Sequence, residues 1–357
     1  MRWYAWAALA VVGVIGFIAW GYFTQRIELR PDGPEAIAAL KAAVEAQDEE
    51  VFYKPAKTPV SAQPTNPLNN VYFGDLHLHT NLSIDSYVFG NRLDLDTAYR
   101  FAKGESAVIA TGERVELTRP LDFAALTDHA EGFGHELACA DPNLGPGGRK
   151  ACDDLESPSV RTFLKLRATA GNRPLVRDLS MFADDAALAK KYAASTWEKI
   201  KEAAERHNEP GTFTTFAGYE YSPTLPDRGK HHRNIIFRSS ESPNHAVSAF
   251  DAASEIDLWK RLEATCTEGC QFLTIPHNPN KTWGLAFASE TIDGIPYSID
   301  DWKIRQRSEP IVEMFQIKGN SECTRAWGAG DEECGLEQFL PACAEGQETS
   351  CIYPTSM

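Results

Sequence analysis

The sequence predicts an α/β fold in which helices lie outside a largely parallel β-sheet. From residue 71 onward, short apolar and β-rich runs alternate with helical stretches, which is the pattern of strands joined by helices. The polar residues within these runs gather at strand ends, where barrels and open sheets build their sites. The 357 residues are 43% hydrophobic and suit one large domain or two small ones. The strand pattern fits either a barrel or an open, doubly wound sheet.

The strand and helix candidates alternate along this region. The strand candidates are residues 71–79, 122–129, 212–220, 232–238, 271–277 and 310–317. The helix candidates are residues 95–103, 159–169, 186–207 and 254–264. We divide the chain into residues 1–30 as a membrane anchor, 31–70 as a helix at 34–47 with a proline-rich linker, 71–322 as the catalytic-type barrel or sheet, and 323–357 as a cysteine-rich tail.

The N-terminal segment predicts export. Residues 3–23 carry no charge and, as a helix, would span roughly 31 Å, enough to cross a bilayer core. Aromatic residues lie near both ends, where they favour the membrane interface. An uncleaved transmembrane helix is the leading interpretation, and a cleaved signal peptide or a buried core helix are the alternatives. Either of the first two would place the rest of the chain in the periplasm or at the extracytoplasmic face of the inner membrane.

The cysteines agree with export. All eight follow residue 138 and fall into near neighbours along the chain. Sequential pairing predicts the disulfides 139–152, 266–270, 323–334 and 343–351, each closing a loop in an oxidising compartment. The alternative is a set of free, buried thiols.

The charge of the chain disfavours a nucleic-acid partner. The formal net charge is −15, and no long run of Lys or Arg supplies a basic stripe. A small anionic substrate is still compatible with this charge, because a local group of metal ions can outweigh the global balance.

Several strands deliver residues of the types that bind metal ions. His77 and His79 are two residues apart on one strand, so both side chains project from the same face. Asp75 shares that face and could accept a hydrogen bond from a ligand imidazole. Other strands end with similar residues, and the fourth begins with a pair: the ends carry Asp128, His129, Glu220 and His277, and the beginning carries His231 and His232. Any one of these groups alone is more often a polar strand end, but their combination predicts a metal site.

The motifs GDLHLHT, TDH, GYE and a later PH resemble those of the polymerase and histidinol phosphatase (PHP) superfamily of metal-dependent phosphoesterases. The runs YFGDLHLHTNLSIDSYVFG, RPLDFAALTDHAE, FAGYEYS and HHRNIIFR resemble an exported bacterial branch of that superfamily with a domain of unknown function. The resemblance covers about residues 70–340. It implies a distorted, seven-stranded β/α barrel, similar to a TIM barrel, with two or three divalent ions (Zn, Mn or Fe) at the rim where strands end.

The resemblance also implies the ligands of those ions. Asp85 stands where many relatives have a histidine, and His231 competes with His232 for one position. The metal ligands carried over are His77, His79, Asp85, His129, Glu220, His232 and His277. The family completes its site with an Asp-x-His motif, but none follows His277, so we expect a C-terminally truncated member that lacks the last strand or strands. Glu313 and Glu322 are later carboxylates, and we assign neither of them to the site.

The resemblance implies a metal-dependent hydrolase, most simply a phosphoesterase whose bridging hydroxide attacks a phosphate ester. Asp128, Arg233 and Lys281 are the candidate catalytic residues, the last two as cations that neutralise phosphate oxygens. Two alternatives keep the same residues: hydrolysis of an amide or another ester, and a truncated, non-catalytic fragment that only binds metal.

Overall fold

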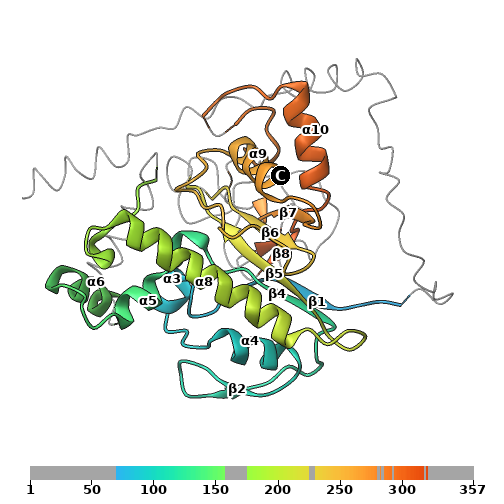
Figure 1. Ribbon diagram of the computed structural model, residues 1–357. Coiled ribbons are helices and arrows are strands. Elements are labelled where there is room, and N and C mark those ends of the chain that lie inside the picture. The colour runs from blue at the N-terminus through green and yellow to red at the C-terminus, as the bar shows by residue number, and fades with distance from the viewer. Residues whose placement is uncertain are drawn as a thin grey trace, which may run out of the picture. The chain divides into compact units, whose positions relative to one another are not determined.

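The computed structural model describes residues 70–156, 175–224, 230–279, 282, 285–291 and 293–316, and the backbone of 319–320. Its centre is a curled, five-stranded sheet in the order β1-β4-β5-β6-β7 (Figure 1). The strands are β1 (Gly74–Leu78), β4 (Phe123–Leu126), β5 (Thr214–Tyr221), β6 (Arg233–Phe237) and β7 (Phe272–Pro276). The sheet has the curvature of half a barrel, and the α/β class predicted from the sequence is confirmed.

The sheet is mixed, which corrects the prediction of a largely parallel one. β1 pairs with β4 and β4 with β5 in parallel, whereas β5 with β6 and β6 with β7 are antiparallel. Parallel neighbours need a long crossover, usually through a helix. Only residues 222–232 connect β5 to β6, too few for such a crossover, and the two strands run in opposite directions.

The sixth predicted strand, residues 310–317, does not join this sheet. Residues 311–314 have no regular structure, and β8 (Phe315–Gln316) pairs with β9 (Gly319–Asn320). The Glu313 N–H donates to the carbonyl of Pro276 at 3.1 Å, so this segment meets the end of β7 through a single backbone bond instead of a ladder.

Three predicted helices are present as α4 (Leu95–Ala102), α8 (Ala186–His207) and α9 (Glu255–Thr265). Each has an N-cap whose side chain accepts a backbone N–H: Asp94, Asp185 and Ser254 respectively. The predicted helices at 34–47 and 159–169 lie outside the described residues. The structure adds helices that the sequence analysis did not predict: α3 (Ile84–Val88), α5 (His135–Ala140), α6 (Pro146–Glu156) and α10 (Ile299–Ser308).

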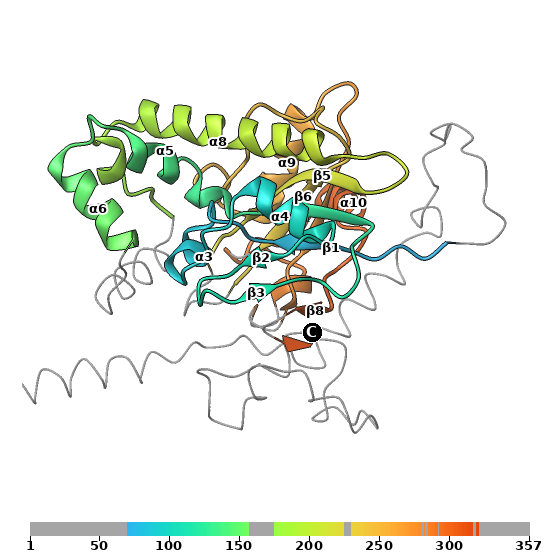
Figure 2. The same ribbon diagram turned by 90° about the horizontal axis from the view of Figure 1, so that it is seen from below.

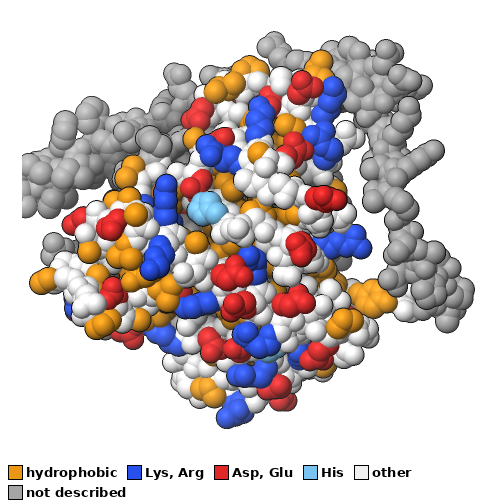
Figure 3. Space-filling view, viewed as in Figure 1, with side chains coloured by type: hydrophobic (Ala, Val, Ile, Leu, Met, Phe, Trp, Pro, Cys, Tyr) orange, Lys and Arg blue, Asp and Glu red, His pale blue; other side chains and the backbone are white. Residues whose placement is uncertain are grey.

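The helices cover one face of the sheet. α8 packs on β5, and α10 packs on α9 and β7 (Figures 1 and 2). Trp197 of α8, Trp259 of α9 and Tyr219 of β5 are fully buried in this core. On the surface that α8 presents, acidic and basic side chains are interspersed (Figure 3), as expected for a solvated helix face.

The opposite face of the sheet has a smaller apolar cluster, built on Ala125, Ile236 and Ile275. Side chains alternate between the two faces along each strand. On each of these strands, a residue two or four positions from the cluster member therefore lies on the same face, opposite the helices. This includes His129, His232 and His277, at the ends of their strands.

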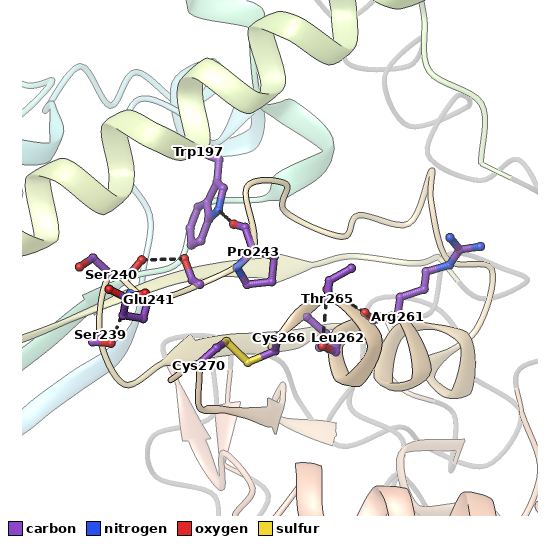
Figure 4. The surroundings of a disulfide bond; sticks show 11 residues. Trp197, Ser239, Ser240, Glu241, Pro243, Arg261, Leu262, Thr265, Cys266 and Cys270 are labelled. Atoms are coloured by element: carbon purple, nitrogen blue, oxygen red, sulfur yellow. Dashed lines mark hydrogen bonds between the residues drawn. A yellow bond between two sulfur atoms is a disulfide. The ribbon is translucent and has the colours of Figure 1, made fainter. Parts of the chain in front are cut away.

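Two of the predicted disulfides are confirmed. Cys139–Cys152 joins α5 to α6, and Cys266–Cys270 closes the turn between α9 and β7, near Trp197 and Pro243 (Figure 4). The pairs predicted at 323–334 and 343–351 lie outside the described residues. Disulfides persist in oxidising compartments, so the two bonds indicate an extracytoplasmic location.

The predicted membrane anchor at residues 3–23 also lies outside the described residues. Within the part of the chain that the structure describes, no helix has the length and apolar character needed to span a bilayer.

The disulfide that closes the longer loop should stabilise the fold more, because loop-closure entropy grows with the logarithm of loop length. Their sequence separations are 13 and 4 residues. Loop-closure entropy predicts that the double variant C139S/C152S lowers the free energy of unfolding by about 3 kcal/mol and C266S/C270S by about 2 kcal/mol. Urea unfolding measures both, and the variant lacking both bonds should show the sum of the two losses. A larger loss from C266S/C270S would contradict the chain-entropy account.

Candidate metal centre

The sheet topology brings one end of each strand to a common rim. β1, β4, β5 and β7 contribute their C-terminal ends, and antiparallel β6 contributes its N-terminal end. Backbone bonds fix the rim: the Glu220 N–H donates to Asp128 at 3.0 Å, and the His277 N–H donates to His232 at 3.1 Å. The structure thus explains why the fourth predicted strand begins, rather than ends, with histidines.

Glu220 of β5 is the centre of this rim. Its side chain is 1% exposed, and its Oε2 lies 2.9 Å from His79 Nε2, 3.2 Å from His129 Nδ1 and 3.5 Å from His77 Nε2. Its other oxygen, Oε1, is 2.7 Å from His232 Nδ1. Four imidazoles, carried by β1 or by the residues next to β1, β4 and β6, therefore converge on a single buried carboxylate.

The imidazoles also contact one another in a closed ring around Glu220. Neighbouring ring centroids are 4.6 to 5.4 Å apart in the order His77, His79, His129, His232, His277 and back to His77. His277 is in this ring, and its Nδ1 lies 2.8 Å from the carbonyl oxygen of Asn278.

Asp85 reaches the ring from α3, beyond the first strand. Its carboxylate oxygens lie 3.3 Å from His129 Nε2 and 3.5 Å from His79 Nδ1. The loop that carries it is fastened by Asn91, whose Nδ2 donates to the His79 carbonyl at 3.2 Å and to Ser86 Oγ at 2.8 Å.

Asp128 holds the same loop through hydrogen bonds to its first residues. It is fully buried and accepts hydrogen bonds from the Thr80 N–H at 2.6 Å, the Thr80 hydroxyl at 2.8 Å and the Ser83 hydroxyl at 2.9 Å. Burial raises the pKa of this carboxyl, although these hydrogen bonds oppose the rise. These hydrogen bonds give Asp128 a positioning role in the loop, and the catalytic role predicted from the sequence stays a prediction.

His232, and not His231, belongs to the ring. The two neighbours point to opposite faces of the sheet. His231 is buried on the helix side, with Nε2 3.5 Å from Glu255 Oε2. Its proximity to His232 in sequence therefore does not bring it to Glu220.

Arg233 also faces the helices, which corrects its prediction as a substrate-binding cation. Its side chain is 1% exposed, with Nε 2.8 Å from Glu309 Oε1 and NH1 donating to the His231 carbonyl at 2.9 Å. Glu309 Oε2 lies 3.2 Å from Arg305 Nε, so two arginines share this carboxylate. Lys281, the other predicted cation, lies outside the described residues.

Asp75 and Glu313 make contacts that differ from those expected from the sequence. Asp75 accepts the backbone N–H of His77 at 2.9 Å, so it supports the strand and not an imidazole. The imidazole of His77 instead meets Glu313, with Nδ1 2.7 Å from Oε1. No local signal links these two, because they are 236 residues apart in sequence.

The electrostatics of the ring favour positive charge. Burial alone would lower the pKa of His77 and His79, but nearby carboxylates outweigh it and raise these pKa values to about 9 and about 10 respectively. Burial would raise the pKa of Glu220, yet the imidazoles around it hold that pKa well below its usual range. For His232, burial dominates and lowers the pKa to about 3. The carboxylates thus create a site suited to a cation.

The donor atoms form three overlapping groups that could hold metal ions. They are His77 with His79 and Glu220, His79 with Asp85 and His129, and His129 with Glu220 and His232. Within each group the donor atoms lie within 4.8 Å of one another. His79, His129 and Glu220 each belong to two groups, an arrangement that suits neighbouring ions sharing ligands.

The new place of Arg233 leads to a prediction about stability. Arg233→Met would leave the buried Glu309 with Arg305 as its remaining arginine partner, so it should lower the free energy of unfolding by about 3 kcal/mol, the low end of the range for a broken buried ion pair. The metal content of the protein that remains folded should not change, because Arg233 lies on the other face of the sheet. Urea unfolding and elemental analysis measure the two effects. A loss of metal in both Arg233→Met and Arg233→Lys would return Arg233 to the site.

Comparison with known proteins places the chain in a family. A family described as "Protein of unknown function (DUF3604)" matches residues 66–356. No curated protein and no solved structure matches the chain. Because the match covers most of the chain, including every strand and ligand candidate described above, the chain belongs to the DUF3604 family.

Proposed function

We propose that this protein is a metal-dependent hydrolase that cleaves a small phosphate ester with the help of two or three divalent ions. The observation that carries the proposal is the buried Glu220 carboxylate, whose oxygens face four imidazoles. The sequence resemblance to the PHP phosphoesterases supports the reaction class.

The residues at the rim fit divalent ions. Imidazole nitrogens and carboxylate oxygens are the donors that Zn, Mn and Fe accept, and this mixture suits a site with more than one ion. Burying Glu220 among neutral side chains would be costly, and bound cations would offset that cost. In this proposal, the ions are held by His77, His79, Asp85, His129, Glu220, His232 and His277.

Bound divalent ions would lower the pKa of a coordinated water and offset the charge of a phosphoryl group. The chain itself fixes the donors. Asp128 and Asn91 hold the loop of His79 and Asp85, and the strand pairing sets the direction of Glu220 and His232. Catalysis of this type depends mainly on such preorganisation.

Lys230 is our candidate for the cation that binds the substrate. It precedes His232 by two residues and so lies on the same side of the chain where β6 begins. Burial lowers the pKa of His232, and the positive charge of Lys230 adds to this effect. Lys230 thus takes the role first assigned to Arg233.

We further propose that the five strands belong to a seven-stranded barrel of the PHP type, and that residues 3–23 anchor the protein outside the cytoplasm. The curvature of the sheet and the two disulfides support these two proposals respectively.

Removal of metal tests the proposed function. Purified protein should contain at least one divalent ion per chain, and chelation should abolish hydrolysis of a phosphomonoester or phosphodiester until Zn²⁺, Mn²⁺ or Fe²⁺ is restored. His79→Ala, which removes a residue shared by two donor groups, should lower turnover by at least about 100-fold. His245→Ala is the matched control, because that side chain is half exposed and pairs with Asp251.

The outcomes separate the alternatives. Metal binding without turnover of any ester or amide would favour the truncated, non-catalytic fragment, and a chain that binds no ion at all would overturn the proposal. Metal-dependent cleavage of carboxyl esters or amides, with phosphate esters left intact, would replace the phosphoesterase with another hydrolase. Full metal-dependent activity in His79→Ala would show that the assignment of the site is wrong.

A further inference from the structure

Glu313 lies behind His77, away from the atoms that converge at the centre of the ring. Its Oε1 is 2.7 Å from His77 Nδ1, whereas the other ring nitrogen, Nε2, faces Glu220 Oε2 at 3.5 Å. Among the described residues, the group that could hold an ion contains His77 with His79 and Glu220, and Glu313 is not in it. His77 thus presents one nitrogen to the ring and the other to Glu313.

A short strap, defined as residues 313–316, fixes this carboxylate. Glu313 Oε2 accepts hydrogen bonds from the Asn278 N–H at 2.7 Å and from Gln316 Nε2 at 3.1 Å. The Asn278 side-chain amide donates to the carbonyl of Met314 at 2.7 Å. Together with the bond from the Glu313 N–H to Pro276, these contacts tie the strap to the end of β7. The position of Oε1 is therefore set by the fold rather than by a free side chain.

The strap also meets a second histidine of the ring. Gln316 Nε2 lies 2.9 Å from His277 Nε2. One segment, which has no regular structure at Glu313 and follows α10, therefore contacts two of the five imidazoles.

We propose that Glu313 is a positioning residue that orients His77 for metal binding, an inference that rests on the proposed function. A carboxylate that accepts the Nδ1 proton leaves the lone pair of Nε2 directed at the ion, and it makes that nitrogen more basic. The strap holds the carboxylate where this bond forms. Glu313 thereby acts through His77 and does not contact the ion.

Zinc affinity and NMR of the full chain test this role. Glu313→Ala should weaken zinc binding by about 10–100-fold in a chelator competition, and Glu313→Gln, which keeps an acceptor oxygen, should weaken it less. Glu268→Gln, at an exposed glutamate in the turn before β7, is the control and should bind zinc like the wild type. In the zinc-loaded wild type, the His77 Nδ1–H should give a strongly downfield resonance, identified by its absence in His77→Ala. That resonance should shift or vanish in Glu313→Ala.

Each contrary result has a distinct meaning. If the wild type binds zinc but Glu313→Ala binds it equally well, or if the His77 resonance does not change, the positioning role is wrong while the proposed function stands. If Glu313→Ala loses a whole ion and keeps the His77 resonance, Glu313 is itself a ligand, which also overturns the inference. If the wild type binds neither zinc nor manganese nor iron, the proposed function fails and this inference fails with it.

Discussion

The buried carboxylate of Glu220 is the constraint on which the rest of the site depends. Taking a carboxylate out of water is costly unless hydrogen bonds or positive charge compensate it. Here the compensation comes from imidazoles on β1, after β4 and before β6, which can carry protons or bind cations. Glu220 lies on the middle strand of the sheet, so its neighbours on both sides must end at the same level. Strand order and strand direction are therefore both part of the site.

Because β6 runs in the reverse direction, all five strands of the sheet place candidate site residues at the same rim. In a parallel strand at that position, a histidine at the start would lie at the opposite edge of the sheet. Because β6 runs antiparallel to β5, its first residues pair with the last residues of β5, as Arg233 does with Tyr221. The connection needed is only a short loop. The chain then returns through α9 and delivers His277 at the end of β7.

The sequence predicted the parts of this arrangement that repeat within a strand and missed those that depend on direction. The alternation of side chains predicted His77 and His79 together, and both reach the ring, although the pairing of β1 with β4 is irregular between Asp75 and Leu78. Apolar runs located all five strands to within a few residues. The strand order and the direction of β6 are tertiary features without a local signal. The error at Arg233 had a local signal, since a residue next to His232 on a strand must point the other way. Glu313 could not be placed, because only the return of the chain after α10 brings it to His77.

The opposed directions of His232 and Arg233 also explain why β6 needs a partner on each face. A slip of one residue in a strand exchanges the two faces, so it would direct Arg233 at the ring and His232 into the helix core. In the observed register, Glu309 meets the guanidinium and Glu220 meets the imidazole, at 2.8 and 2.7 Å. A slip of one residue in either direction would separate Glu309 from the guanidinium and Glu220 from the imidazole. Leaving a buried carboxylate without its partner costs several kcal/mol. The ion pair on the helix side therefore supports the candidate metal site indirectly, because it penalises the registers in which His232 would be lost from the ring.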